Sequence, residues 1–203
     1  MTRMAGRQAP PLQTIREIKP HTFIFEQPRA LAIDICNEMI RRFEAGTDEQ
    51  YPGRIGQTGQ EDQDVKRSTD LVVSGKPHWK DIDGELFRSL GRAIREFREA
   101  YPFFKGPFKD SGYAIQRTDP GEFYHWHIDG GSHEFSQRQL VAVWYLNDVP
   151  GPGGETEFSC QQVKITPEAG KLLLFPPFWT HEHRGVTLET GVKYIATTWV
   201  IFA

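Results

Sequence analysis

The sequence has few cysteines, no long apolar run and little net charge, and each shortage excludes a class of protein. Two cysteines in 203 residues, without a Cys-x-x-Cys pair, argue against a disulfide framework and a zinc–thiolate site, so Cys36 and Cys160 are expected to be buried free thiols. The most hydrophobic stretches, such as KLLLF and VAVWYL, are far shorter than the roughly 20 residues of a membrane-spanning helix. The amino terminus lacks the apolar run of a secretory signal, which predicts a cytoplasmic protein with no membrane partner.

The net charge of the chain also indicates no particular class of binding partner. A net charge of −3, without a basic stripe, predicts no nucleic-acid partner. A hydrophobic content of 38% and an aromatic content of 12% are typical of a globular protein. No internal repeat is evident, which argues against solenoids and propellers. We therefore expect one domain over residues 1–203, beginning with an arm over residues 1–20.

The first half of the chain predicts two helices joined by a long loop. Apolar side chains recur at every third or fourth position in residues 28–46, where Gly46 is the expected stop, and more strongly in residues 81–101. Asp81 or Asp83 is the expected N-cap of the second helix. Residues 46–70 are polar and glycine-bearing, which predicts a loop that is either mobile or a functional lid.

From about residue 112 the sequence changes to short strand-like runs separated by glycine and proline turns. The run LVAVWYL predicts a strand that is buried on both faces. The expected fold class is therefore α+β and mainly β. Residues 21–111 would form a helical annex containing the loop 46–70, and residues 112–203 a jelly-roll core whose outer face the helices cover.

The stretch GEFYHWHIDGG concentrates side chains that bind metals. If residues 122–129 form a strand, His125, His127 and Asp129 share one face, because successive side chains alternate. The Cα atoms of a His-x-Asp pair lie about 7 Å apart, a span that two inclined side chains can bridge to one ion. A hydrogen-bonded structural histidine is the alternative interpretation of this short pattern.

A metal site would need a third ligand from elsewhere in the chain. The candidates are His133, His181 and His183, and the last two follow the strand-like run KLLLFPP. Two histidines and one carboxylate on one side of an ion form the facial triad of non-heme Fe(II) oxygenases, which leaves positions open for a co-substrate and oxygen.

Five segments together carry a resemblance to a known family. TDPGEFYHWHIDGG, VWYLND, GPGGETEF, GKLLLFPPFWTHEHRG and GVKYIATTWVIF resemble, in this order, the double-stranded β-helix domain of 2-oxoglutarate- and Fe(II)-dependent dioxygenases. The resemblance is to the prolyl 4-hydroxylase-like group and covers about residues 112–202. It implies that His127 and Asp129 are the first two iron ligands.

The same resemblance implies the third ligand and a co-substrate site. In the family the distal histidine is followed eight residues later by glycine and about ten later by a basic residue that binds the far carboxylate of 2-oxoglutarate. His183, Gly191 and Lys193 fit this spacing, whereas His181 would place the basic residue at twelve. A buried lysine also needs a counter-ion, which a dicarboxylate supplies.

Further pocket residues follow from the resemblance. Tyr145 matches a tyrosine that binds the same carboxylate, and Thr197 and Trp199 share strand parity with Lys193; each could equally belong to the core. Thr156, in a glycine-rich turn, is a second-rank pocket candidate. The sequence departs from many relatives in having Thr118 where they carry tyrosine, so one co-substrate hydrogen bond is expected to be missing or to come from another residue.

The resemblance implies an Fe(II)- and 2-oxoglutarate-dependent hydroxylase, with O2 as a reactant and ascorbate as an optional cofactor. A peptide or protein is the expected substrate, and a free amino acid or other small metabolite is the alternative. A cupin-like module that binds a metal without turnover is the alternative of a different class. His125 is left as a structural residue or a substrate contact, and Arg67 and Ser68 in the loop 46–70 as speculative substrate contacts. The oligomeric state is not predicted.

Overall fold

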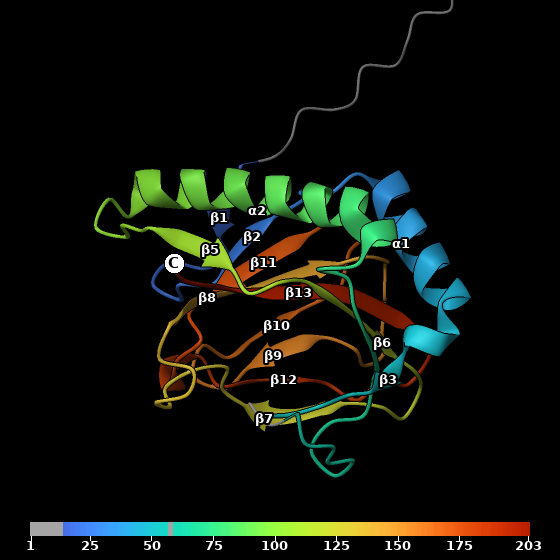
Figure 1. Ribbon diagram of the computed structural model, residues 1–203. Coiled ribbons are helices and arrows are strands. Elements are labelled where there is room, and N and C mark those ends of the chain that lie inside the picture. Colours follow the sequence, from blue (N-terminus) through green and yellow to red (C-terminus); the bar gives the residue numbers. More distant parts are fainter. Residues whose placement is uncertain (1–13, 57–58) are drawn as a thin grey trace, which may run out of the picture.

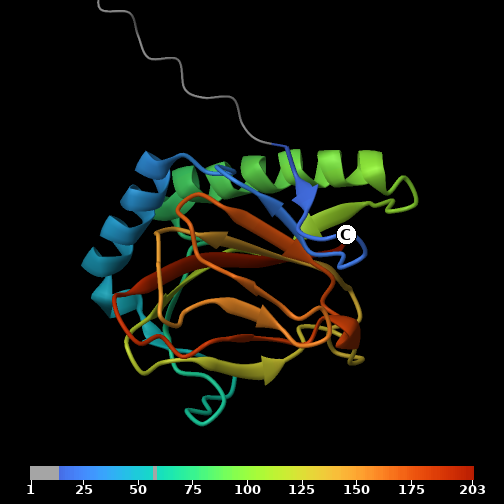
Figure 2. The same ribbon diagram turned by 180° about the vertical axis from the view of Figure 1, so that it is seen from behind.

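The computed structural model describes residues 14–56 and 59–203. Two β-sheets face each other, and two helices cover the outer side of the larger sheet (Figures 1 and 2). The expected arm over residues 1–20 lies outside the described residues as far as residue 13, as do residues 57–58 of the loop 46–70. The fold is mainly β with few helices, as the sequence predicts.

The larger sheet contains nine strands among the described residues. Their order is β1-β2-β11-β8-β13-β6-β4-β3, and β5 pairs with β13. The bounds are Arg16–Glu17 (β1), Phe25–Gln27 (β2), Tyr51–Pro52 (β3), Thr69–Val72 (β4), Phe108–Asp110 (β5), Ala114–Thr118 (β6), Arg138–Tyr145 (β8), Leu172–Phe175 (β11) and Lys193–Phe202 (β13). The expected helical annex thus also contributes strands β2 to β5 to this sheet.

The smaller sheet contains four strands in the order β10-β9-β12-β7. The bounds are Tyr124–His127 (β7), Thr156–Phe158 (β9), Val163–Ile165 (β10) and His183–Gly185 (β12). In Figure 1 this sheet lies below the larger one, and β7 is its outermost strand. The two sheets line an enclosed space, to which the smaller sheet contributes residues of β7, β9 and β12.

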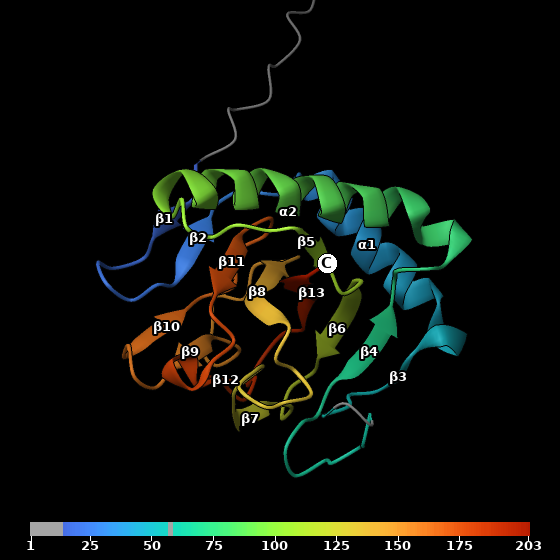
Figure 3. The ribbon, with the colours of Figure 1, turned by 60° about the vertical axis from the view of Figure 1, so that its left-hand side comes forward.

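The two helices lie where their apolar periodicity predicts. Helix α1 spans Ile33–Ala45 and is followed by Gly46, and α2 spans Lys80–Ala100. Both bury their apolar stripes against the larger sheet (Figure 3), and Trp144 of β8 donates its indole N–H to Ser89 of α2 at 3.0 Å. Short 3-10 turns occur at Thr47–Glu49 (η1), Pro77–Trp79 (η2) and Trp179–His181 (η3).

The predicted N-cap of the second helix is wrong. Trp79 occupies the N-cap position, because the turn η2 runs directly into the helix. The two aspartates in the first helical turn have other partners: Asp81 pairs with Arg42 of α1 at 2.7 Å, and Asp83 accepts a hydrogen bond from Ser74. The carboxylates still lie at the positive end of the helix dipole, which favours them there.

Strand β8 confirms the prediction that LVAVWYL is buried on both faces. Leu140, Ala142 and Trp144 point into the core beneath the helices. Val141 and Val143 point to the opposite side, into the core between the two sheets. This strand therefore separates the structural core from the enclosed space.

The cysteine prediction is confirmed in one respect and wrong in another. Cys36 and Cys160 are both free thiols, but only Cys36 is buried. Cys160 lies in the turn after β9 rather than in a strand, so its side chain is exposed. Among the described helices none is long and apolar enough to cross a membrane.

Candidate metal centre and co-substrate site

Strand β7 departs from simple alternation, and the departure decides which side chains reach the enclosed space. Its register with β12 shifts: His127 pairs with His183 and Tyr124 with Gly185, so β7 has one extra residue between these pairs. Such a bulge changes the face on which the preceding side chains lie. Tyr124 consequently lines the cavity, whereas His125 is exposed. The predicted common face is right for His127 and Asp129 and wrong for His125.

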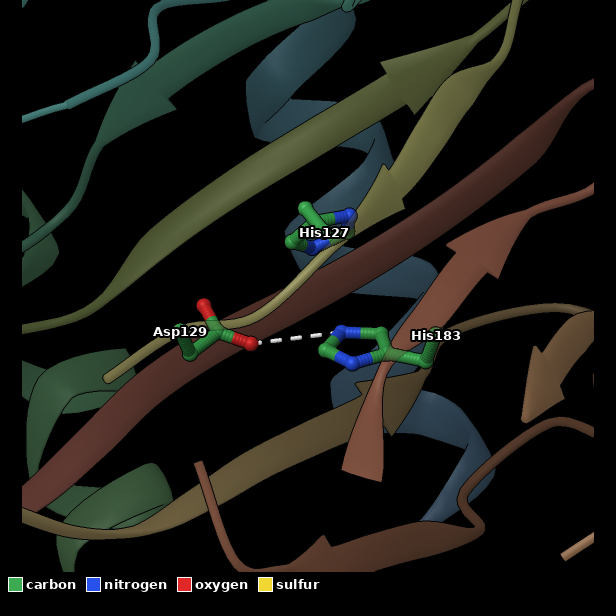
Figure 4. Close-up of side chains that lie close together, drawn as sticks. All are labelled: His127, Asp129 and His183. Atoms are coloured by element: carbon green, nitrogen blue, oxygen red, sulfur yellow. Dashed lines mark ion pairs between the residues drawn. The ribbon is translucent and has the colours of Figure 1, made fainter. Parts of the chain in front are cut away.

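The structure brings the three predicted iron ligands together. One ligand atom of each of His127, Asp129 and His183 lies within 4.8 Å of the others. Figure 4 shows the Asp129 carboxylate pointing toward the His183 ring, and the Oδ2–Nε2 distance is 3.2 Å. The cluster is therefore compact enough for one ion to be reached from all three side chains.

Backbone hydrogen bonds fix which ring nitrogen of each histidine is free. Nδ1 of His127 lies 2.7 Å from the carbonyl oxygen of His125, and Nδ1 of His183 lies 2.9 Å from that of His181. A carbonyl can only accept, so each Nδ1 carries the proton and each Nε2 keeps its lone pair. This arrangement is typical of metal-ligating histidines, so the residues present fit a bound ferrous ion.

Asp129, the carboxylate of this candidate metal centre, is held at two points. Trp199 donates its indole N–H to Oδ1 at 2.9 Å, and Arg138 donates to the Asp129 backbone carbonyl at 2.6 Å. The Arg138 guanidinium lies between the rings of Phe135 and Trp199, 3.8 and 3.7 Å from their centroids. Arg138, which the sequence did not reveal, thus connects the two groups that orient the carboxylate.

The pKa values of His127 and Asp129 favour the protonation states in which these side chains bind a metal ion. Burial, together with the neighbouring His183, lowers the pKa of His127 to about 3, so its imidazole is neutral at physiological pH. Burial alone would raise the pKa of Asp129, but its interactions with His183, His127 and the indole N–H of Trp199 outweigh burial and leave the pKa below its ordinary value. A neutral imidazole and an ionised carboxylate are the forms that bind a divalent cation.

The other candidate histidines lie elsewhere. His181 is buried, with Nε2 donating to the carbonyl of Thr22 and Nδ1 accepting from Thr180, both at 2.9 Å. Both ring nitrogens are therefore already engaged. His133 is exposed, and neither residue is in the described cluster of ligand-type side chains. The geometry thus favours His183 over His181, as the family spacing does.

Lys193 extends from the first position of β13 into the same cavity. Its side chain is buried, and Nζ donates to the carbonyl oxygen of Gly154 at 2.8 Å. No carboxylate of the described residues forms an ion pair with it. Burial lowers the pKa of Lys193 to about 8, and the charge of Glu155 offsets this only in part. A dicarboxylate would supply the missing counter-charge, so the cavity fits 2-oxoglutarate.

The remaining predicted pocket residues divide into two groups. Thr118, Thr156, Thr197 and Trp199 line the cavity. Tyr145 is completely buried behind it and donates its hydroxyl hydrogen to Oγ1 of Thr156 at 2.7 Å. Thr156 therefore keeps its own hydroxyl hydrogen for a partner in the cavity. The roles of these residues toward 2-oxoglutarate stay predictions.

The cavity itself has a volume of about 530 Å³, which is within the range of small-molecule sites, about 300–1,000 Å³. Part of its lining comes from the loop 46–70, which lies beside β7 in Figure 3. Backbone hydrogen bonds join the loop to β7: Arg67 N–H to the Phe123 carbonyl and His125 N–H to the Val65 carbonyl, each at 2.9 Å. The closure of this loop over a substrate stays a prediction.

Tyr124 is the main cavity residue that the strand pattern missed. Its ring stacks on that of His127, with centroids 3.6 Å apart and planes inclined by 15°. The spacing of three residues between Tyr124 and His127 is incompatible with a common face of a regular strand, so the bulge had to be seen to place it.

Comparison with known proteins adds independent findings. Residues 113–201 match the family model described as the 2OG-Fe(II) oxygenase superfamily. A PKHD-type hydroxylase of Synechococcus sp. (strain CC9902) is 28% identical over 89 residues, which is 42% of this chain. The chain spans 39% of the length of that relative.

Three solved structures share the fold. A prolyl hydroxylase from Trichoplax adhaerens, in complex with a peptide fragment of the hypoxia inducible factor oxygen degradation domain, is 16% identical with a TM-score of 0.75; the match covers 89% of this chain and 84% of that one. A Pseudomonas putida prolyl-4-hydroxylase is 19% identical with a TM-score of 0.67 and coverages of 89% and 93%. A viral collagen prolyl hydroxylase from Paramecium Bursaria Chlorella virus-1 is 18% identical with a TM-score of 0.67 and coverages of 92% and 100%.

The segment matched by the family model contains the residues that form the candidate metal centre. Residues 113–201 contain all three side chains of the metal cluster and Lys193, and the fold around them is that of prolyl hydroxylases. Fe(II) and 2-oxoglutarate are the metal and the co-substrate that this family model implies. Residues 113–201, which hold the candidate metal ligands and Lys193, therefore match the model of the 2OG-Fe(II) oxygenase superfamily.

Proposed function

We propose that the protein is a 2-oxoglutarate- and Fe(II)-dependent dioxygenase that hydroxylates an unactivated C–H bond of a peptide or protein, in the manner of a prolyl 4-hydroxylase. The observation that carries this proposal is a compact cluster of His127, Asp129 and His183 in the same cavity as the buried ammonium of Lys193. The two facing sheets would then constitute the jelly-roll core, with the reaction between them.

The protein would hold the metal and the co-substrate from opposite directions. Nε2 of His127, Nε2 of His183 and the carboxylate of Asp129 are the ligand atoms, and Lys193 is the partner of the distant carboxylate of 2-oxoglutarate. Thr156 donates a hydrogen bond to that carboxylate, and Tyr145 acts through Thr156 by fixing the orientation of its hydroxyl group. When bound, Fe(II) and 2-oxoglutarate supply the oxidising chemistry, which consumes O2 and yields succinate and carbon dioxide.

The other task of the chain is to keep water from the reacting centre. Val141, Val143 and Phe175 line the inner part of the cavity, so the co-substrate is enclosed by apolar side chains. A water-excluded site strengthens the ion pair of Lys193 with its carboxylate. It also prevents the oxidising equivalent from being lost to solvent.

A peptide substrate is favoured by the shape of the opening. The cavity extends from the metal cluster to the loop 46–70 and to β4 and β6, so its opening is lined by several separate elements. The Trichoplax adhaerens structure with a similar fold holds a peptide fragment. An extended peptide can contact several elements at once, whereas a small metabolite contacts few.

The experiment is incubation of the purified iron-loaded protein with 2-oxoglutarate, oxygen and a peptide digest of cell extract. We expect succinate release and peptides that gain one oxygen atom in mass. Asp129→Ala should abolish both products, because it removes a metal ligand. Asp48→Ala is the matched control, since Asp48 is exposed in η1 and should leave both products unchanged.

The alternative of a binding module gives a different result. Such a protein would bind Fe(II) and 2-oxoglutarate with wild-type side chains but release no succinate with any substrate. If products gain oxygen in a pool of free amino acids and not in peptides, the small-metabolite alternative replaces the peptide substrate.

A further inference from the structure

A second charged group lies in the cavity, in addition to the metal ligands and Lys193. Nζ of Lys66 forms an ion pair with Oδ2 of Asp70 at 2.7 Å, and Ser68 donates its hydroxyl hydrogen to Oδ1 of the same carboxylate at 2.7 Å. The Lys66 and Asp70 side chains are only 4% and 7% exposed, yet both residues line the cavity. Buried ion pairs seldom stabilise a fold more than apolar residues would, so their presence requires another explanation.

The surrounding backbone is shaped to admit this group. Gly53 donates its backbone N–H to the carbonyl of Ser68 at 2.8 Å and lies directly against the ion pair. A methyl group at position 53 would collide with the Ser68 hydroxyl and would lie 3.0 Å from Cε of Lys66. The side chains of Lys66 and Ser68 therefore occupy space that only a glycine leaves free.

In the ion pair of Lys66 and Asp70, the carboxylate has used both of its oxygens but the ammonium has not used all of its donors. Both oxygens of Asp70 accept a bond, one from Lys66 and one from Ser68. The ammonium of Lys66 has three N–H donors, and among the described residues Asp70 is its one hydrogen-bond acceptor. The ring of Tyr124, 5.3 Å from Nζ, provides a weaker cation–π contact. Lys66 thus retains donors for a group that enters the cavity.

Two arginines extend the positive charge to the opening. The Arg54 guanidinium lies 4.7 Å from the ring of Tyr51, and the Arg67 guanidinium lies 5.2 Å from the ring of Phe123. All four residues line the cavity. Each arginine has an aromatic face beneath it, which holds the guanidinium in place. Nε of Arg67 donates to the carbonyl of Gln63 at 2.8 Å, so the terminal N–H donors of its guanidinium are the ones that can reach a ligand.

The carboxylates near these arginines neutralise them only weakly. Glu61 is 3.8 Å from Arg54, and Asp64, which is 98% exposed, is 3.9 Å from Arg67. Solvent-exposed pairs at such distances contribute little. Apart from the metal cluster and Lys193, the charged groups lining the cavity are therefore three cations against one carboxylate, Asp70.

We propose that Lys66, assisted by Arg54 and Arg67, is a carboxylate-binding subsite that selects an acidic substrate. The subsite is distinct from the proposed position of 2-oxoglutarate, because Nζ of Lys66 lies against the Asp70 carboxylate whereas Nζ of Lys193 lies against the Gly154 carbonyl. Through Tyr124, whose ring contacts both Lys66 and His127, it is adjacent to the metal cluster. The substrate would therefore carry its carboxylate close to the carbon that is hydroxylated. This inference rests on the proposed function and names the substrate class of the same site.

The test compares acids with their amides. Protein loaded with Mn(II) and 2-oxoglutarate is kept free of oxygen and dialysed against two peptide pools. The pools have the same sequences except that one contains Asp and Glu where the other contains Asn and Gln. A parallel arm uses free amino acids and their primary amides, which separates an acidic side chain of a peptide from the carboxylate of a small molecule. Mass spectrometry of the retained ligands measures the preference.

We expect the acid to be retained at least about 10-fold more strongly than the amide, because hydrogen bonds between charged groups are roughly twice as strong as neutral ones. The preference should decrease as ionic strength rises. Lys66→Met combined with Asp70→Asn should remove the preference without leaving an unpaired buried charge. Lys164→Met is the matched control, since Lys164 forms a pair with Glu157 at 3.4 Å outside the cavity lining.

The outcomes are distinct. Equal retention of acid and amide by the wild-type protein, or a preference that survives the double substitution, overturns the inference. If the double variant does not fold, Arg54→Gln and Arg67→Gln at exposed positions must each weaken the preference several-fold, and no change overturns it. A wild-type protein that binds neither Mn(II) nor 2-oxoglutarate instead refutes the proposed function, and the subsite with it.

Discussion

The hydrogen bond from Trp199 to Asp129 offers a direct test of how the metal centre is assembled. Trp199→Phe keeps an aromatic ring beneath Arg138 but removes the indole N–H that lies 2.9 Å from Oδ1. The remaining oxygen, Oδ2, is the one that faces His183. The substitution therefore removes the constraint that turns Oδ2 toward the other ligands while it leaves every ligand in place.

The size of the effect follows from the charge on the acceptor. A hydrogen bond to a charged group contributes about 1.5–3 kcal/mol, which corresponds to roughly 10–100-fold in a dissociation constant. Loss of an outer partner of a metal ligand typically lowers metal affinity by the same factor, about 10–100-fold. Because Trp199 is only half-buried, we expect the lower end of this range, about 10-fold.

The assay is competition for Mn(II) between the protein and a chromogenic chelator. Trp126→Phe is the control, because Trp126 is on β7 but is partly exposed and contacts Arg184 on the outside of the sheet. Circular dichroism would confirm that both variants are folded. Equal Mn(II) affinities in the two variants would refute the idea that Trp199 orients the carboxylate.

Two further predictions concern the distal histidine and the lysine. His183→Ala should abolish Mn(II) binding, whereas His181→Ala should retain it, because both ring nitrogens of His181 are bonded to Thr22 and Thr180; retention in the first and loss in the second would reverse the ligand assignment. The affinity for 2-oxoglutarate should fall as pH rises through about 8, since the pKa of Lys193 is lowered to about 8 and only the protonated ammonium attracts a carboxylate. In Lys193→Arg, whose guanidinium stays charged, calorimetry should show no such decrease, and a decrease that persists would assign the titration to another group.

The sequence predicts a good part of this fold because its local patterns agree with the tertiary structure. The helices α1 and α2 lie where the apolar period of 3.6 places them, and β8 is buried on both faces, as its unbroken apolar run indicates. Spacing and family resemblance predict His127, Asp129 and His183 as iron ligands, and the structure brings these three side chains together. The signal was strong there because chemistry, spacing and order pointed to the same residues.

Other features depend on long-range pairing that no local pattern encodes. The bulge that turns Tyr124 inward exists only because β7 pairs with the distant strand β12. The loop 46–70 offered Arg67 and Ser68 as substrate contacts, but its buried cation is Lys66, whose partner Asp70 lies just inside β4. A polar loop sequence does not reveal which of its charges the fold will bury.

The position of the proposed ligands in the smaller sheet affects how metal binding would change the stability and degradation of the protein. Of the three proposed ligands, His127 ends β7, Asp129 lies two residues beyond it and His183 begins β12, and β7 is an edge strand of that sheet. A ferrous ion would link β7 to β12 across this edge, since a ligand that binds only the native state increases its stability as the free ligand concentration rises above the dissociation constant. Iron starvation would loosen this edge first and expose it to proteases, while the helix-covered sheet remained intact. The abundance of the folded protein would then follow the supply of its own metal.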